Sequence, residues 1–215
     1  MNMPIKNNIN ELNKWVTNNI SIDEKFLSIK KFETGQSNPT YLLSSANKSF
    51  VLRSKPFGHL LLGAHRIDRE YKVMSALDKS FVPVPKMYGY CNDINVIGSE
   101  FYIMEYLDGA HMFDPSLPKC SVKQRDLIYR DKIEILAELA SIDIKKLGLE
   151  NFGKPQGYLE RQINLWIKQY RSSQTKNIKS MEYLIEHIPQ HIPEEIEKLP
   201  ACLLHGDFRL DNMIL

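Results

Sequence analysis

The sequence lacks the features that mark secreted, membrane-spanning or disulfide-bonded proteins. Among 215 residues it has only three cysteines, Cys91, Cys120 and Cys202, which form no Cys-x-x-Cys pair and leave one thiol over in any pairing. A reducing compartment is the simplest interpretation, and we expect a cytoplasmic protein. No run of about 18 apolar residues occurs, and residues 1–20 lack the apolar core of a signal peptide. The sequence therefore predicts a soluble protein without a membrane partner.

The sequence also has little excess of either charge. It carries 28 Lys and Arg residues against 26 Asp and Glu residues, which gives a formal net charge of +2. A nucleic-acid partner bound through a strongly basic surface is therefore not expected. Hydrophobic residues make up 43% of the chain, which is enough for a packed core and too much for a disordered protein. The length permits one ordinary domain or two small lobes.

Strand patterns dominate the first half of the chain. Short β-prone runs bounded by turn-forming residues predict strands at 26–33, 40–46, 48–54, 86–91 and 100–107. The first three runs follow one another directly, which predicts an antiparallel meander. Between the third and fourth runs, apolar residues recur at helical spacing over residues 64–79 and predict an amphipathic helix.

Helical periodicity replaces the strand pattern after residue 107. Helices are expected at 121–142, 157–172, 178–188 and 193–199, with one more short helix within residues 2–19. This order predicts an α+β protein with two lobes. The sheet-rich lobe would cover residues 1–106, and the mainly helical lobe would cover residues 107–215.

The segment HGDFRLDN at residues 205–212 carries the sharpest chemical signal. It matches the catalytic-loop pattern of kinases, in which His-x-Asp is followed by four residues and then Asn. In that pattern Asp207 would accept the proton of a substrate hydroxyl, and Asn212 would offer its amide oxygen to Mg²⁺, which prefers oxygen ligands. The alternative is a loop histidine and a turn-forming aspartate without a chemical role.

Other segments supply the companions of such a loop, in the order that kinases require. Arg53, on the third expected strand, stands where a phosphate-binding cation is expected, and Glu70 on the next helix could pair with it. The turn between the first two strands could contact phosphates with its backbone N–H groups and small hydroxyls, although it contains no GxGxxG motif. Its candidate residues are Gly35, Gln36, Ser37 and Asn38. Solvated Arg and Glu side chains and an ordinary hairpin are the alternatives.

The last expected strand leads into a segment that could bind an adenine ring. The backbone of Glu105, Tyr106 and Leu107 would hydrogen-bond the edge of the ring, and Met104 would pack behind it. A plain buried strand explains the same apolar residues equally well.

Taken together, these segments resemble the aminoglycoside phosphotransferase-like (APH/choline kinase) family. Within it they resemble the branch formed by the kinase domain of acyl-CoA dehydrogenase family members ten and eleven. The resemblance is carried by TGQSNPTYLL, FVLRSKPFG, AHRIDREYKVMSAL, VPVPKMYGYCND, VIGSEFYIMEYLDG, GYLERQINLW and HGDFRLDN. It implies a protein-kinase-like two-lobe fold with a nucleotide-binding first lobe. It also implies transfer of the γ-phosphoryl group of ATP, with Mg²⁺, to a hydroxyl of a small molecule, for this branch a hydroxyacyl-CoA-like one.

The resemblance also assigns roles to individual residues. Asp207 would be the catalytic base, His205 a brace of its loop and Asn212 a metal ligand. Arg53 would clamp the phosphates with Glu70 as its partner, and residues 35–38 would cover them. An acyl-CoA dehydrogenase, separate or fused, would be a further partner. The family continues after the catalytic loop with a strand and a second metal-binding Asp, whereas Leu215 is the last residue here. We therefore expect a C-terminally truncated chain with little or no activity.

Two other functions stay open. A non-catalytic, pseudokinase-like module would bind a nucleotide or acyl-CoA without transferring phosphate. A metallohydrolase would use His205, Asp207 and histidines such as His65 and His111, but the sequence has no HxH or HExxH spacing. Candidates for an acceptor pocket in the helical lobe are Tyr158, Arg161, Gln162 and Trp166. A Trp or Tyr on a helical stripe is, however, more often part of a core.

Overall fold

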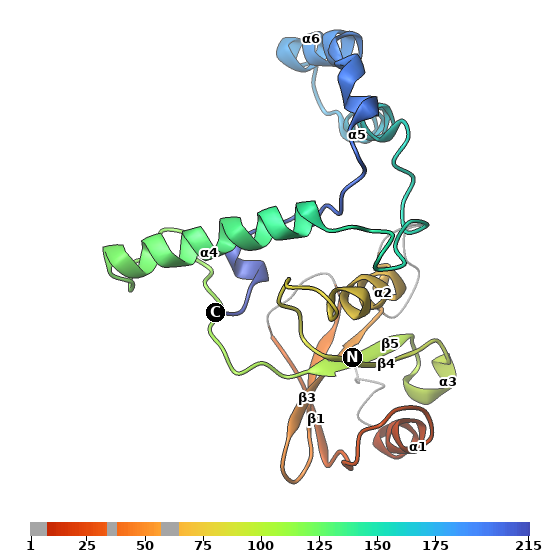
Figure 1. The fold of residues 1–215 in the computed structure, drawn as a ribbon. Coiled ribbons are helices and arrows are strands. Elements are labelled where there is room, and N and C mark those ends of the chain that lie inside the picture. The colour runs from red at the N-terminus through yellow and green to blue at the C-terminus, as the bar shows by residue number, and fades with distance from the viewer. Residues whose placement is uncertain (1–7, 34–37, 57–64) are drawn as a thin grey trace. The chain divides into compact units, whose positions relative to one another are not determined.

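The computed structural model describes residues 8–33, 38–56 and 65–215 (Figure 1). The chain divides into two compact units. The first combines Met1–Ile142 with Leu204–Leu215, and the second is Asp143–Leu203. The predicted boundary between a sheet-rich and a helical lobe near residue 107 does not coincide with this division, since residues 107–142 belong to the same compact unit as the sheet. The boundary stays a prediction.

A five-stranded antiparallel sheet forms the centre of the first unit (Figure 1). Its strands are β1 (Ser28–Lys31), β2 (Thr40–Ser44), β3 (Ser49–Ser54), β4 (Met87–Cys91) and β5 (Phe101–Glu105). The spatial order β1-β2-β3-β5-β4 contains the predicted meander. Thr40 lies opposite Arg53, and Arg53 lies opposite Tyr102. Because directly opposed residues share one face of a sheet, this register gathers the three side chains on one face.

The two faces of the sheet have different cover. The helix α1 (Ile9–Asn19) buries Leu12 and Val16 in the main hydrophobic core, together with alternate residues of the strands such as Leu43, Leu52 and Ile103. The helix α2 (Ile67–Leu77) lies on the opposite face, where its Tyr71 ring lies 6.2 Å from the ring of Tyr102 (Figure 1). The face that carries Arg53 is therefore the one covered by α2.

One short helix of this unit, α3 (Ile94–Ile97), has no counterpart in the periodicity of the sequence. The side chain of Asp93 caps its start by accepting a hydrogen bond from the backbone of Asn95, at 2.9 Å. Gly98 ends it with φ of 91°, a conformation that favours glycine. An Asp and a Gly five residues apart are the local signal that could have identified it.

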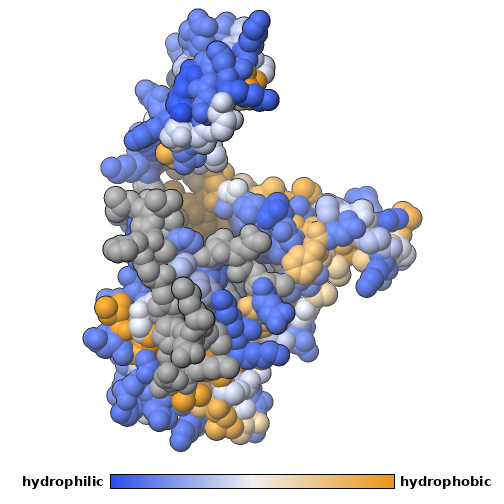
Figure 2. Space-filling view, turned by 180° about the vertical axis from the view of Figure 1, so that it is seen from behind, coloured by the Kyte–Doolittle hydropathy of each residue, from blue (hydrophilic) through white to orange (hydrophobic). Residues whose placement is uncertain are grey.

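The long helix α4 (Val122–Ser141) begins with a capping box, in which Ser121 and Gln124 exchange hydrogen bonds. Of its residues only Leu139 is buried. Leu127, Ile133 and Leu136 are exposed, and Figure 2 shows the apolar surface along this helix. The predicted helix thus exists, but the described residues cover only part of its apolar surface.

The second unit is helical, as predicted. It contains α5 (Tyr158–Ser173), α6 (Lys179–His187) and the short 3-10 helices η2 (Ile188–His191) and η3 (Glu194–Lys198). Two hydrogen bonds of 2.6 and 2.5 Å join Arg171 of α5 to Glu182 of α6. All three cysteines are free thiols. None of the helices in the described ranges is both long enough and apolar enough to cross a bilayer.

Candidate active site

The catalytic-loop segment is an exposed turn that ends in the 3-10 helix η4 (Leu210–Asn212). The carboxylate of Asp207 accepts hydrogen bonds from Asn212 Nδ2 at 2.9 Å and from Arg209 Nε at 2.7 Å. The backbone N–H of Asp207 donates to His205 Nδ1 at 3.2 Å, which is the contact that a brace of the loop requires. Gly206 has φ of 83°, so a residue with a side chain would be strained there. The loop thus brings the three polar residues of the motif together.

The neighbours of Asp207 decide its protonation. The hydrogen bond from Asn212, and then that from the Arg209 guanidinium, hold the pKa of the Asp207 carboxyl below its usual range. The group is therefore ionised at neutral pH and can accept a proton. Because Asn212 donates through Nδ2, its amide oxygen Oδ1 is left to accept or to ligate.

Two contacts attach this segment and the residues after it to the rest of the unit. The ammonium group of Lys132 on α4 lies 5.7 Å from the centre of the Phe208 ring, which itself packs edge-on to His205 within the loop at 5.3 Å. After the loop, Leu215 and Ala110 exchange two backbone hydrogen bonds of 3.0 and 3.1 Å. The chain that leaves β5 therefore runs directly beside the chain that follows the catalytic loop.

The second cluster lies on the α2 face of the sheet. The expected ion pair is present: Arg53 Nε donates to Glu70 Oε2 at 2.8 Å. Tyr102 donates its hydroxyl to the same oxygen at 3.0 Å, and Arg53 Nη1 donates to Thr40 Oγ1 at 3.1 Å. The side chains of Arg53 and Glu70 keep 27% and 35% of their surface exposed. The pair is thus held firmly and still open to a ligand.

Tyr102 takes part in this cluster as a neutral donor. Burial, and then the negative charge of Glu70, raise the pKa of the Tyr102 hydroxyl above its ordinary value, while Arg53 opposes the shift. The hydroxyl therefore keeps its proton and donates a hydrogen bond to Glu70.

Of the predicted phosphate-covering residues, the structure describes only Asn38. Gly35, Gln36 and Ser37 lie outside the described residues. Asn38 is 3% exposed, and its side chain contacts Glu70 and His65, so its amide group is already used. Its predicted role over the phosphates would fall to its backbone.

The segment proposed for the adenine ring follows β5. Met104 is half-buried in the strand, opposite Val51. The N–H of Glu105 already donates to the carbonyl of Lys86 at 2.9 Å. Within the described ranges, the backbone groups of Tyr106 and Leu107 make no backbone hydrogen bond, so these two residues have N–H and carbonyl groups available.

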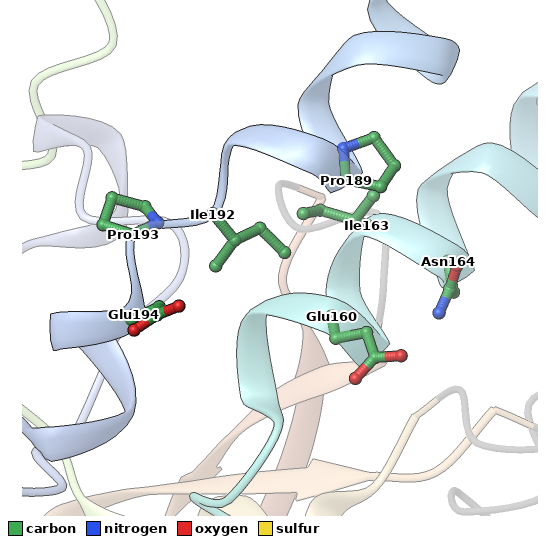
Figure 3. Close-up of a pocket in the computed structure, with 7 residues that line it drawn as sticks. All are labelled: Glu160, Ile163, Asn164, Pro189, Ile192, Pro193 and Glu194. Carbon is green, nitrogen blue, oxygen red and sulfur yellow. The ribbon is translucent and has the colours of Figure 1, made fainter.

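The second unit contains a cavity of about 370 Å³ between α5 and the 3-10 helices η2 and η3 (Figure 3). Its walls are Glu160, Ile163, Asn164, Pro189, Ile192, Pro193 and Glu194. None of the predicted acceptor candidates lines it. Trp166 and Tyr158 are 66% and 40% exposed, so neither lies in a core of the described residues. Gln162 is half-buried on the same helix, and Arg161 donates to the backbone carbonyls of Lys154 and Gln156.

A three-ligand metal centre of the hydrolase type finds no support. Among the described residues, no three or more His, Cys, Asp or Glu side chains are grouped to hold a metal. His65 instead bonds to Asn38, and His111 stacks on Phe113. The oxygens of Asp207 and Asn212 are suitable for a hard cation such as Mg²⁺ rather than for zinc.

Comparison with known proteins identifies the group to which these residues belong. The sequence model of the "Phosphotransferase enzyme family" matches residues 28–215. The chain belongs to this family. Both clusters described above lie within the matched part of the chain.

Individual relatives agree with this family. The mouse "Acyl-CoA dehydrogenase family member 10" is 43% identical over 188 residues, which are 87% of this chain and 17% of that protein. A solved structure from Ralstonia eutropha, described as an aminoglycoside phosphotransferase, has a TM-score of 0.85 and 40% identity. It covers 96% of this chain, which spans 60% of that one. The predicted resemblance, including its branch, is confirmed.

A more distant structure bears on the fold alone. The GDP complex of aminoglycoside 2'-phosphotransferase-IIIa has a TM-score of 0.65 at 16% identity, covering 97% of this chain and 67% of that one. The predicted α+β, protein-kinase-like fold is therefore confirmed.

Three neighbours of the site did not emerge from the sequence: Thr40, Tyr102 and Arg209. His65 was considered only as a ligand of a metallohydrolase, and the structure places it against Asn38 instead. Thr40 and Tyr102 flank Arg53 only once the strand register is known, because they are 13 and 49 positions away along the chain. Arg209, by contrast, lies two residues from Asp207 inside the motif. Its charge beside a catalytic carboxylate was a signal that could have been used.

Proposed function

We propose that this phosphotransferase moves the γ-phosphoryl group of ATP, with Mg²⁺, to a hydroxyl of a small molecule. The observation that carries the proposal is the pairing of Asp207 with Asn212, whose side chains meet at 2.9 Å on one exposed loop. An ionised carboxylate can orient a hydroxyl and take its proton, and the adjacent amide offers a neutral oxygen. A nucleotide is named in the GDP complex of the distant structural relative, which supports nucleotide use in this fold.

The first-lobe cluster would hold the phosphates. Arg53 directs Nε to Glu70 and Nη1 to Thr40, and its Nη2 has no hydrogen bond within the described residues. A guanidinium fixed at two corners can present the third to a phosphate oxygen. Glu70 balances the charge before the nucleotide arrives. The backbone of residues 105–107 would receive the adenine edge.

The donor atoms fit a magnesium ion. Asn212 Oδ1 and the Asp207 carboxylate are hard oxygen ligands of the kind that Mg²⁺ prefers. A bound Mg²⁺ would neutralise charge on the phosphate oxygens.

The acceptor is proposed from similarity. The chain spans 17% of the mouse relative, so the activity of that whole protein belongs to more than the matched part. Its name contains an acyl-CoA dehydrogenase, and we propose a hydroxyacyl-CoA-like acceptor, with such a dehydrogenase as a fused domain or partner. The free thiols suit a reducing, cytoplasmic setting.

Asp207→Asn tests the proposed reaction in protein expressed from its complete gene. Transfer of labelled phosphate from ATP to hydroxyacyl-CoA should fall by about 10²–10⁴-fold, the usual contribution of a general base, while the Kd of Mg-ATP stays nearly constant. Asp23→Asn, at an exposed site, is the matched control. Full transfer by Asp207→Asn would contradict the assigned base.

The non-catalytic alternative has a different signature. A pseudokinase-like module would bind ATP equally well with and without Mg²⁺ in calorimetry and would transfer no phosphate. The amide oxygen left open at Asn212 favours the metal-dependent result.

A further inference from the structure

Asn38 is one of the few buried polar residues in the described part of the chain, with 3% of its surface exposed. Its side-chain amide is used at both ends. Asn38 Nδ2 donates to Glu70 Oε1 at 2.8 Å, and Asn38 Oδ1 lies 2.8 Å from His65 Nδ1. Because an ionised carboxylate only accepts, the NH₂ group must face Glu70. The oxygen then faces His65, which must donate through Nδ1–H.

The two carboxylate oxygens of Glu70 accept hydrogen bonds from different donors. Oε1 receives Asn38, whereas Oε2 receives both Arg53 and Tyr102. A carboxylate held at both oxygens cannot rotate about its terminal bond. The donor on Oε1 therefore determines where Oε2 lies, and with it the position of the Arg53 guanidinium.

Asn38 also reaches Arg53 by a second route. Its backbone carbonyl accepts the Thr40 hydroxyl proton at 3.1 Å, which leaves the Thr40 oxygen to accept Nη1 of Arg53 at 3.1 Å. Both partners of the ion pair are thus fixed from the same residue. The pair itself remains about one-third exposed, while the residue that holds it is buried.

His65 completes the arrangement under local strain. It has φ of 59°, a conformation that few residues other than glycine adopt. Its carbonyl accepts the N–H of Ile67 at 3.0 Å at the start of α2, and its ring holds Asn38. A strained residue that is fixed at both ends is the kind of feature that clusters at functional sites.

We propose that Asn38 is a positioning residue for the phosphate-binding arginine and that His65 locks its amide in the required orientation. The proposal rests on the proposed function, because Arg53 needs a fixed position only if it binds phosphate. It gives the Asn38 side chain an orienting role behind the ion pair, in addition to the predicted place of Asn38 in the phosphate-covering loop. A guanidinium positioned in this way would meet a phosphoryl oxygen without rearrangement.

The test reads the arginine directly. In isotope-labelled full-length protein, NMR follows solvent exchange of the Arg53 Nε–H in the wild type, Asn38→Ala and the exposed-turn control Asn47→Ala. Asn38→Ala should raise this exchange rate about tenfold, the factor that corresponds to loss of one hydrogen bond to a charged group, and Asn47→Ala should not change it. The Kd of Mg-ATP should weaken by a similar factor or less.

A second pair of variants keeps the test decisive if Asn38→Ala fails to fold. His65→Gln retains an N–H donor for Asn38 Oδ1, whereas His65→Ala removes it. Faster exchange at Arg53 in His65→Ala, restored by His65→Gln, supports the proposal, since lost packing would not be rescued in this way.

The outcomes separate the two proposals. Unchanged Arg53 exchange in the Asn38 and His65 variants overturns the positioning role, whatever happens to nucleotide affinity. If exchange rises as expected but Mg-ATP never shifts the Arg53 signal of the wild type, the positioning role stands and the proposed function fails.

Discussion

The chemistry of single residues in this protein depends on neighbours that come from elsewhere in the chain. Asp207 and Asn212 were predicted from one motif, because eight contiguous residues carry their spacing. Arg53 and Glu70 were predicted from their order, and their ion pair is present. Thr40 and Tyr102 could not be predicted, since their proximity to Arg53 is a consequence of strand register. Sequence therefore indicated which candidate residues come together better than it indicated the groups that orient them.

The lowered pKa of Asp207 leads to a prediction at this scale. Asn212→Ala removes the hydrogen bond that contributes most to this shift. The pKa of the Asp207 carboxyl should therefore rise toward the ordinary value of Asp, as measured by NMR titration of the carboxyl carbon. Asn151→Ala, at an exposed site in the second unit, should leave it unchanged. A pKa that does not move would show that Arg209 alone controls the group.

The sign of the stability effect follows from the same shift. Because the pKa is lower in the folded chain, the ionised carboxylate stabilises the fold above the unfolded-state pKa. That contribution disappears as the pH falls through the lowered folded value. The acid end of the denaturation profile should therefore move to higher pH in Asn212→Ala.

At the scale of elements, periodicity predicted the strands and the longer helices, and the structure adds what periodicity does not contain. The expected helix over 193–199 is the 3-10 helix η3, in a segment bounded by Pro193 and Pro200. The helix α3 spans four residues, too few to show a repeat. The order of β5 between β3 and β4 is likewise absent from the linear sequence, because it arises from pairing across the sheet.

The close approach of two loop segments gives a prediction for an element boundary. A methyl group on Gly109 would lie 2.4 Å from Ile214 Cγ2 and 2.7 Å from the carbonyl oxygen of Leu215. Gly109→Ala should therefore push apart the two backbone segments that hydrogen-bond at Ala110 and Leu215. The resulting overpacking should destabilise the protein by about 1–3 kcal/mol. Thermal unfolding and hydrogen exchange of the Ala110 and Leu215 amides would measure this.

Gly153→Ala is the matched control, because the added methyl group meets nothing within 4 Å. Equal stability of the two variants, with the Ala110 amide still protected, would mean that the segments are not in contact in solution.

At the scale of the whole molecule, a net charge of +2 gives nucleotide recognition no strongly basic surface. Recognition of a nucleotide would then depend on individually placed cations, and Arg53 is one that hydrogen bonds hold in a fixed position. Charge composition could not indicate which cations are fixed. The two compact units were also beyond sequence reasoning, because the first is built from separate stretches of chain.

Mg-ATP binding should therefore protect one unit selectively. At a ligand concentration of about 100 times Kd, linkage stabilises the binding unit by about 2.7 kcal/mol, so its most protected amides should exchange about a hundredfold more slowly. Amides of Asp143–Leu203 should be unaffected by nucleotide alone. Mass-resolved hydrogen exchange would detect the difference, and Arg53→Ala should abolish it at the same ATP concentration. Equal protection of α5 would contradict this assignment.

The reciprocal bonds between Ala110 and Leu215 also constrain the order of events during synthesis. The first unit requires Leu204–Leu215, so a nascent chain that has reached residue 142 cannot complete it. All of Asp143–Leu203 must emerge from the ribosome first, and its helices can form from local contacts before Leu204–Leu215 joins the first unit. Closing the long loop formed by Asp143–Leu203 has an entropic cost that grows only slowly with the length of the loop. An insertion or deletion within the second unit would thus be tolerated far better during folding than a change in the final residues that close the first.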